Sequence, residues 1–248
     1  MDLNPTTLLV VVCLFLAAFI KGTTGLGFPL IATPMVALLL DIRSAVTVLI
    51  IPSLLMDIAQ ILRGNFPHSV FTRFLWLLLF GVIGAFLGTK LLVTLPLWIL
   101  NLSLGVMVLV FVGTNSFQFD FRIPSSAEKF ASPAVGLISG FLNGMTNVSG
   151  PALAIYLFSL RLPKTEFVKA ISSIFFVIKI GQLVGISTWN LLTLPLLRLS
   201  VGLMVFIFLG FFAGIKTHDR INQQTFNRAL LALLFVVGMT LVVLSLSL

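Results

Sequence analysis

Residues 17–40 read AAFIKGTTGLGFPLIATPMVALLL, and residues 139–162 read SGFLNGMTNVSGPALAIYLFSLRL. Aligned without a gap at an offset of 122 residues, the two stretches share identical residues that include Gly22 and Gly144, Thr24 and Thr146, Pro29 and Pro151, and Ala32 and Ala154. The same offset aligns further identical residues: Gln60 with Gln182, and Phe86-Leu87-Gly88 with Phe208-Leu209-Gly210. Leucine matches arise by chance in an apolar chain, but a shared proline, glutamine and Phe-Leu-Gly triplet do not. We therefore interpret the chain as an internal duplication of residues 1–122 and 123–248.

The composition predicts a membrane protein. Hydrophobic residues make up 59% of the chain and charged residues 9%, which leaves too little polar surface for a soluble protein. Apolar runs near the ~20 residues that cross a bilayer as helix recur throughout, and the alternating pattern of a transmembrane β-barrel is absent. Ten apolar segments are predicted: about 5–21, 27–40, 44–63, 70–91, 96–113, 132–143, 149–160, 166–188, 195–215 and 226–247. The sequence thus predicts an all-α polytopic protein with about 8–10 transmembrane segments, about five helical segments to each copy.

Lys and Arg divide unevenly between the two sides of the predicted membrane domain. Ten of the 15 lie in the connections of one side: 63–73, 114–131, 161–169 and 216–228. Three lie on the other side, which has both termini and the connections 41–44, 90–95 and 188–198. Because basic loops stay in the cytoplasm, both termini are predicted to be periplasmic. Basic residues in short loops beside apolar runs indicate membrane orientation and not nucleic acid binding.

Equivalent loops of the two copies have opposite charge. The 63–73 connection is basic, whereas its equivalent, 185–195, is nearly free of charge, and the bias is reversed between 41–44 and 161–169. Equivalent loops on opposite sides predict two inverted repeats, a recurring plan of secondary transporters. A parallel duplication with uneven charges is the alternative.

The first two segments of each copy are predicted to be short. The run from Leu8 to Ile20 extends over roughly 20 Å as a helix, and the segment before Asn143 is similar. Such pairs form either a re-entrant hairpin or two thin, tilted crossings. Both arrangements leave an odd number of crossings in each copy, so the inversion holds in either case.

Each copy contains a break, in which Gly, Thr, Asn and Pro interrupt an apolar run. Irregular backbone within the hydrocarbon region is tolerated only where it is buried inside the protein or lines a water-filled cavity. A second helix is predicted to begin at each break, with Pro29 or Pro151 in its first turn and Thr24, Asn147 or Ser149 as its cap. Since a helix start offers N–H groups and a partial positive charge, two breaks that meet near the bilayer midplane form a candidate anion site.

The candidate substrate-binding residues are those of the two breaks. Lys21 adds a full positive charge, and the glycines allow a ligand to approach the backbone closely. The set is Lys21, Gly22, Thr23, Thr24, Gly25, Gly27, Asn143, Gly144, Thr146, Asn147, Ser149 and Gly150. The alternative is that Gly and Pro only kink the helices for close packing, as is common in membrane proteins.

Four further residues are candidates for coupling or gating: Asp57, Gln60, Lys179 and Gln182. Asp57 and Lys179 are equivalent at the offset, and each lies in an apolar segment, where an ionisable side chain is costly enough to indicate function. Their expected depths differ by roughly 10 Å. This difference argues against a direct salt bridge unless the lysine extends far, so separate roles at two gates are an equal alternative. Asp57 is the candidate for proton coupling, and the two glutamines either line the path or cross-link helices.

Other patterns indicate packing or the absence of catalysis. Gly81, Gly84 and Gly88, with Gly202, Gly210 and Gly214, have the small-residue spacing of close helix contacts. No metal-ligand spacing, phosphate loop, nucleophile elbow or His-Glu-x-x-His helix occurs, so we expect no metal, no cofactor and no enzymatic activity.

The two breaks, KGTTGLGFP and NGMTNVSGP, resemble those of the TauE/SafE family of sulfite and organosulfonate exporters. The similarity covers most of the chain, which departs from the glycine-richest family pattern at Phe28, the equivalent of Gly150. The resemblance implies a bacterial inner-membrane protein that exports a small sulfur-containing anion such as sulfite, sulfoacetate or another organosulfonate.

Together with the inverted copies, the resemblance predicts a secondary transporter that works by alternating access. Its expected partners are the lipid bilayer, a small anionic substrate and, as a candidate coupling ion, protons. The alternatives are a passive anion channel, a transporter of another small anion such as a carboxylate, and a membrane scaffold without transport activity.

Overall fold

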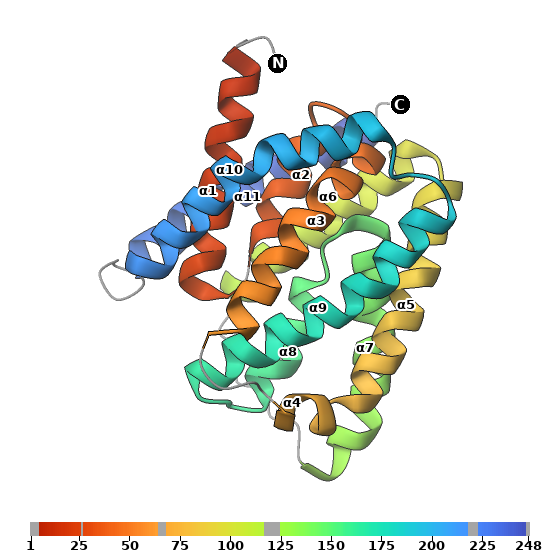
Figure 1. Ribbon diagram of the computed structural model, residues 1–248, viewed down its shortest axis with the longest axis vertical. Helices are drawn as coiled ribbons and strands as arrows, with labels where there is room; N and C mark the ends of the chain where they lie inside the picture. The colour runs from red at the N-terminus through yellow and green to blue at the C-terminus, as the bar shows by residue number, and fades with distance from the viewer. Residues whose placement is uncertain (1–4, 26, 64–67, 117–124, 218–222, 247–248) are drawn as a thin grey trace.

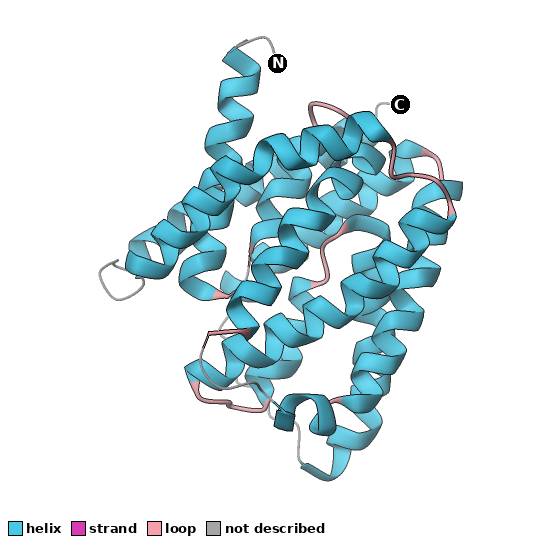
Figure 2. Cartoon of the chain, viewed as in Figure 1, coloured by secondary structure: helices cyan, strands magenta, loops and turns pink. Residues whose placement is uncertain are grey.

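The computed structural model describes residues 5–25, 27–63, 68–116, 125–217 and 223–246, and the regular structure of these residues is helical (Figures 1 and 2). The helices are α1 Pro5–Thr24, α2 Phe28–Ala37, α3 Ile42–Ile61, α4 His68–Arg73, α5 Leu75–Thr94, α6 Leu97–Ser116, α7 Ser125–Thr146, α8 Gly150–Ser159, α9 Lys164–Thr188, α10 Leu194–Thr217 and α11 Gln223–Leu246. Five of them, α3, α5, α6, α9 and α10, are long and apolar enough to cross a membrane. The prediction of an all-α polytopic membrane protein is confirmed. The expected boundary between the copies, at residues 122–123, lies outside the described residues.

Side chains are distributed as a lipid solvent requires. Large apolar residues face outward, with exposed fractions of 59% for Leu209 on α10 and 61% for Val236 on α11. The charged side chains of Lys21, Asp57 and Lys179, by contrast, are at most 1% exposed. In hydrocarbon, apolar groups gain nothing by moving inward, whereas polar groups must find partners inside the protein.

Two differences from the predicted segments exceed the few residues by which sequence-based boundaries usually shift. The predicted 70–91 segment is divided at Phe74 into the short α4 and the long α5. Helix α7 begins seven residues before the expected position of residue 132, because its first two turns are polar. There, the Glu128 carboxylate accepts hydrogen bonds of 2.7 and 2.9 Å from Arg73.

The expectation of two short segments in each copy is only half right. Helices α2 and α8 have 10 residues each, about 15 Å, which is too short to cross a bilayer. Helices α1 and α7, with 20 and 22 residues, reach at least about 30 Å, although neither is among the five described helices that are both long and apolar enough to cross. The predicted short first segments were too short because polar residues at the helix ends were left out of the apolar runs.

Helices of the first predicted copy pack against helices of the second. At the offset of 122 residues, α2 coincides with α8 at both ends, and α3 begins where α9 begins. At this offset α1 is equivalent to α7, α5 to α10, and α3 to α9. Helix α1 packs against α10, and α7 packs against α5, so these two contacts are equivalent. Helix α3 packs against its own equivalent, α9. In Figure 1 the α2–α3 connection lies at the upper end of the molecule and the α8–α9 connection at the lower end. Such an exchange of packing partners between the copies is the pattern that a twofold relation between two halves produces.

Glycines set how closely these helices approach. A Cβ atom on Gly88 or Gly140 would lie 2.0 Å from a carbonyl oxygen across the α5–α7 contact, and one on Gly214 would lie 2.1 Å from the Phe19 carbonyl oxygen across the α1–α10 contact. The packing prediction is confirmed likewise at Gly84 and Gly210, but it is wrong at Gly202, which has nothing within 4 Å of a Cβ position.

Replacing Gly140 with alanine is expected to destabilise the protein by about 1–3 kcal/mol, because the added methyl group collides with the rigid backbone of Gly81. The measurement is thermal unfolding of purified protein in detergent. The matched control is Gly202→Ala, which meets open space and should change stability by less than about 0.5 kcal/mol. Equal unfolding temperatures for the two variants would contradict the packing role.

Candidate functional site

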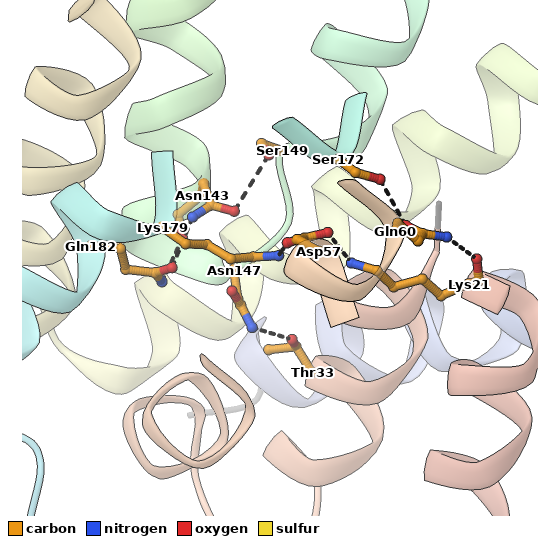
Figure 3. A network of polar contacts seen from close by, with 10 residues as sticks. All are labelled: Lys21, Thr33, Asp57, Gln60, Asn143, Asn147, Ser149, Ser172, Lys179 and Gln182. Carbon is orange, nitrogen blue, oxygen red and sulfur yellow. Dashed lines mark hydrogen bonds and ion pairs between the residues drawn. The ribbon is translucent and has the colours of Figure 1, made fainter. Parts of the chain in front are cut away.

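The two breaks line one cavity. Gly27, Pro29 and Leu30 from the first break face the same hollow of about 20 Å³ as Asn143, Asn147 and Ser149 from the second. The Nδ2 atom of Asn147 also donates a 3.4 Å hydrogen bond to the Thr33 hydroxyl of α2 (Figure 3). Two segments about 120 residues apart in sequence are therefore brought together, as the anion-site hypothesis requires.

The helix starts at this cavity have no side-chain caps, contrary to expectation. Among the residues that the structure describes, no side chain caps α2 or α8. The Thr24 hydroxyl donates to the Ile20 carbonyl at 2.9 Å, within its own helix, and the Ser149 hydroxyl donates to Asn143 Oδ1 at 3.4 Å. The N–H groups of both first turns therefore keep their capacity to bind an anion.

The glycines of the breaks divide into two groups. Gly25 and Gly27 have φ angles of 81° and 100°, a left-handed backbone that glycine adopts without strain and that turns the chain into α2. Gly22 and Gly144 lie inside helices, where a Cβ atom would come within 2.3 and 2.1 Å of a carbonyl oxygen of α10 and α5. At these two positions the structure supports close packing instead of ligand approach. Gly150 begins α8.

The break threonines bond locally. The Thr23 hydroxyl donates to the Ile20 carbonyl at 2.8 Å and the Thr146 hydroxyl to the Leu142 carbonyl at 2.9 Å. Both therefore satisfy their hydroxyl protons within their own helices.

A buried cluster of three charges lies beside the cavity (Figure 3). The Asp57 carboxylate on α3 accepts hydrogen bonds from Lys21 of α1 at Oδ1 and from Lys179 of α9 at Oδ2, the latter at 2.5 Å. Lys179 also lines the cavity, and its ammonium lies 5.2 Å from the centre of the Phe175 ring. With two cations around one anion, the cluster carries one net positive charge.

The direct Asp57–Lys179 pair corrects the argument from depth. That estimate treated both helices as upright and symmetric about their midpoints, whereas α3 has 20 residues and α9 has 25 and the two pack against each other. The four-carbon stem of lysine covers the remaining distance.

The two glutamines cross-link the breaks to the neighbouring helices. Gln60 Nε2 donates to the Lys21 carbonyl at 2.9 Å, and Gln182 Nε2 donates to the Asn143 carbonyl at 2.9 Å. These bonds are equivalent at the offset of 122 residues. Each side-chain oxygen also accepts a hydrogen bond. Gln60 Oε1 accepts from the Ser172 hydroxyl at 2.7 Å, and Gln182 Oε1 accepts from Asn143 Nδ2 at 2.8 Å.

Sequence reasoning missed Thr33, Ser172 and Phe175. Their equivalents by offset are Ile155, Ile50 and Ser53, so the duplication gives no signal at these positions. The remaining clue for Thr33 and Ser172 was a small polar residue in an apolar helix, which does not distinguish a network member from an ordinary packing residue. Phe175 is apolar and gave no signal.

Removing the carboxylate is expected to destabilise the protein more than removing the whole cluster. Asp57→Ala leaves two buried ammonium groups unpaired and should cost about 3–5 kcal/mol. The triple variant Lys21→Met, Asp57→Leu, Lys179→Met removes every charge and should recover most of that loss while losing transport. Thermal unfolding in detergent compares the three proteins, and a triple variant no more stable than Asp57→Ala would contradict this account.

The comparisons with known proteins identify the family of the chain. The family model described as Sulfite exporter TauE/SafE matches residues 10–241 of the 248. No curated protein and no solved structure matches the chain. The matched region contains both breaks, the charged cluster and both glutamines. The chain therefore belongs to the TauE/SafE family of sulfite exporters, which are membrane transporters and not enzymes.

Proposed function

We propose that the protein is a secondary transporter that exports a small sulfur-containing anion across the bacterial inner membrane. Sulfite, sulfoacetate and other organosulfonates are the substrates that family membership favours. The observation that carries the proposal is the meeting of two uncapped helix starts at one cavity that the buried Lys179 lines, with a second buried lysine, Lys21, bonded to the same carboxylate. N–H groups and ammonium groups that converge in a site of low dielectric select an anion.

We propose further that the two halves are inverted repeats and alternate in access. The exchanged helix partners, the equivalent glutamine bonds and the opposite positions of the α2–α3 and α8–α9 connections support this arrangement. The start of α1 and the end of α11 lie toward the same end as the α2–α3 connection, which supports both termini being on one side. The distribution of Lys and Arg favours the periplasm for that side.

Occlusion of the charged cluster favours a carrier over a channel. Lys21, Asp57 and Lys179 are at most 1% exposed, so the site is closed to bulk water. A carrier passes through such an occluded state between its two open states, whereas a conducting channel keeps a continuous path. Counterflow in proteoliposomes tests the proposal, since preloaded sulfite accelerates uptake of labelled sulfite only through a carrier.

Loss of either lysine is expected to weaken the anion site. Lys21→Ala and Lys179→Ala each leave the cluster with no net positive charge, so the Kd for sulfite should rise on the order of 10–100-fold. The matched control is Lys90→Ala, because Lys90 is exposed near the end of α5. Binding by calorimetry and uptake in proteoliposomes give the readouts. Wild-type kinetics in a folded Lys21 or Lys179 variant would remove that residue from the site.

Asp57 is the proposed site of coupling to protons. In Asp57→Asn the amide keeps the shape of the side chain but neither carries the charge nor takes up the proton. We expect transport of a divalent anion in this variant to lose its dependence on a pH gradient. Glu166→Gln, an exposed change on α9, is the control. An unchanged response to the gradient in Asp57→Asn would exclude the coupling role.

A further inference from the structure

Asp57 occupies the position between the two lysines that an anionic substrate needs. We propose that the Asp57 carboxylate holds the place of the substrate, so that an arriving anion takes over the ammonium groups of Lys21 and Lys179 while Asp57 releases them. This inference rests on the proposed function and adds the charge rule by which the site accepts its ligand.

The cavity is too small for the proposed substrate while Asp57 stays in place. The cavity beside Lys179 measures about 20 Å³, which accommodates one water-sized molecule. Sulfite has four heavy atoms, and an organosulfonate has more. Asp57 is fully buried and bonded to both lysines. An anion can therefore fit in the site and bind both ammonium groups only when the Asp57 carboxylate moves away.

The Asp57 carboxylate resembles a sulfite or sulfonate group as a hydrogen-bond acceptor. A carboxylate presents two oxygens to the two ammonium groups, one to each, as Oδ1 and Oδ2 of Asp57 do (Figure 3). A sulfite or sulfonate group presents three oxygens around one sulfur atom, so two of them can accept from the same two donors. The third oxygen is then available to the uncapped helix starts.

Few charged groups surround Asp57. Lys21 from α1 and Lys179 from α9 are the charged groups bonded to Asp57 in the part of the chain that the structure describes. Helices α2 and α6, which also pack against α3, contain no titratable side chain. The remaining charged residues of the neighbouring helices are near helix ends: Lys164, Glu166 and Lys169 on α9, and Arg198 and Lys216 on α10. The site therefore carries one net positive charge with Asp57 ionised.

This charge sets a rule for ligand binding. A monovalent anion neutralises the cluster while Asp57 stays ionised. A divalent anion neutralises it only if a proton from water adds to a carboxylate oxygen of Asp57 and forms an O–H bond. Since an uncompensated charge is costly inside the membrane, we infer that divalent anions bind with one proton and monovalent anions with none.

Isothermal titration calorimetry on the wild-type protein tests the rule directly. The probes are thiosulfate, a dianion near neutral pH, and methanesulfonate, a monoanion at every working pH. Titration in two buffers that differ in ionisation enthalpy gives the number of protons taken up for each anion bound. We expect about one proton for thiosulfate and about zero for methanesulfonate. The same proton count for both probes overturns the inference.

The Asp57→Asn variant provides a second test. Without the competing carboxylate, methanesulfonate should bind with a Kd about tenfold lower, and thiosulfate should bind without proton uptake. Glu166→Gln is the control and should keep both wild-type proton counts. A folded Asp57→Asn protein that binds methanesulfonate more weakly than wild type would show that Asp57 supports the site instead of competing for it.

The experiments separate this inference from the proposed function. If neither the two probes nor sulfite gives saturable heat with the wild-type protein, the anion site itself is refuted. If the anions bind with equal proton counts, the anion site stands and the placeholder role of Asp57 fails. The wild-type proton count decides the question even where the variant does not fold.

Discussion

Burial of charge where the two halves meet is the constraint on which the rest of the structure depends. Asp57 and Lys179 come from equivalent helices and bond to each other, and Lys21 joins them from the first break. Charges without partners at this depth would cost several kcal/mol each, so the helices that carry them must stay in contact. The position of the first break is fixed as a result, because Lys21 lies in the last turn of α1.

Each break is held by elements of both halves. Gly22 brings α1 against α10, Gly144 brings α7 against α5, and the two glutamines bind the main chain at the end of α1 and α7. Because α10 and α5 belong to the opposite halves, a movement of one half against the other displaces both breaks. The tight glycine contacts transmit such a movement, because the backbones of the two helices touch directly and no deformable side chain lies between them.

The sequence predicted the parts of this site that depend on pattern. Helix segments, breaks and equivalent residues follow from apolar periodicity and from a constant offset, and the structure brings both breaks to one cavity. The sequence did not predict the Asp57–Lys179 bond, because an offset identifies equivalent positions but not helix tilt or side-chain reach. The caps were wrong because Thr24 and Ser149 have alternative acceptors close by, and the choice between such acceptors depends on geometry that sequence does not contain.

The difference between the halves follows from the same electrostatics. In the twofold arrangement that we propose, residues near the axis contact their own equivalents, and α3 and α9 do pack against each other. Two identical charges at such positions would repel each other in a medium of low dielectric, so a duplicated site can hold charge there only after the copies diverge. Asp57 and Lys179 have opposite signs, and Lys21 has the neutral Asn143 as its equivalent. A third lysine at position 143 would raise the net charge of the cluster to two. The present divergence leaves one positive charge, which suits a site that one anion fills and vacates.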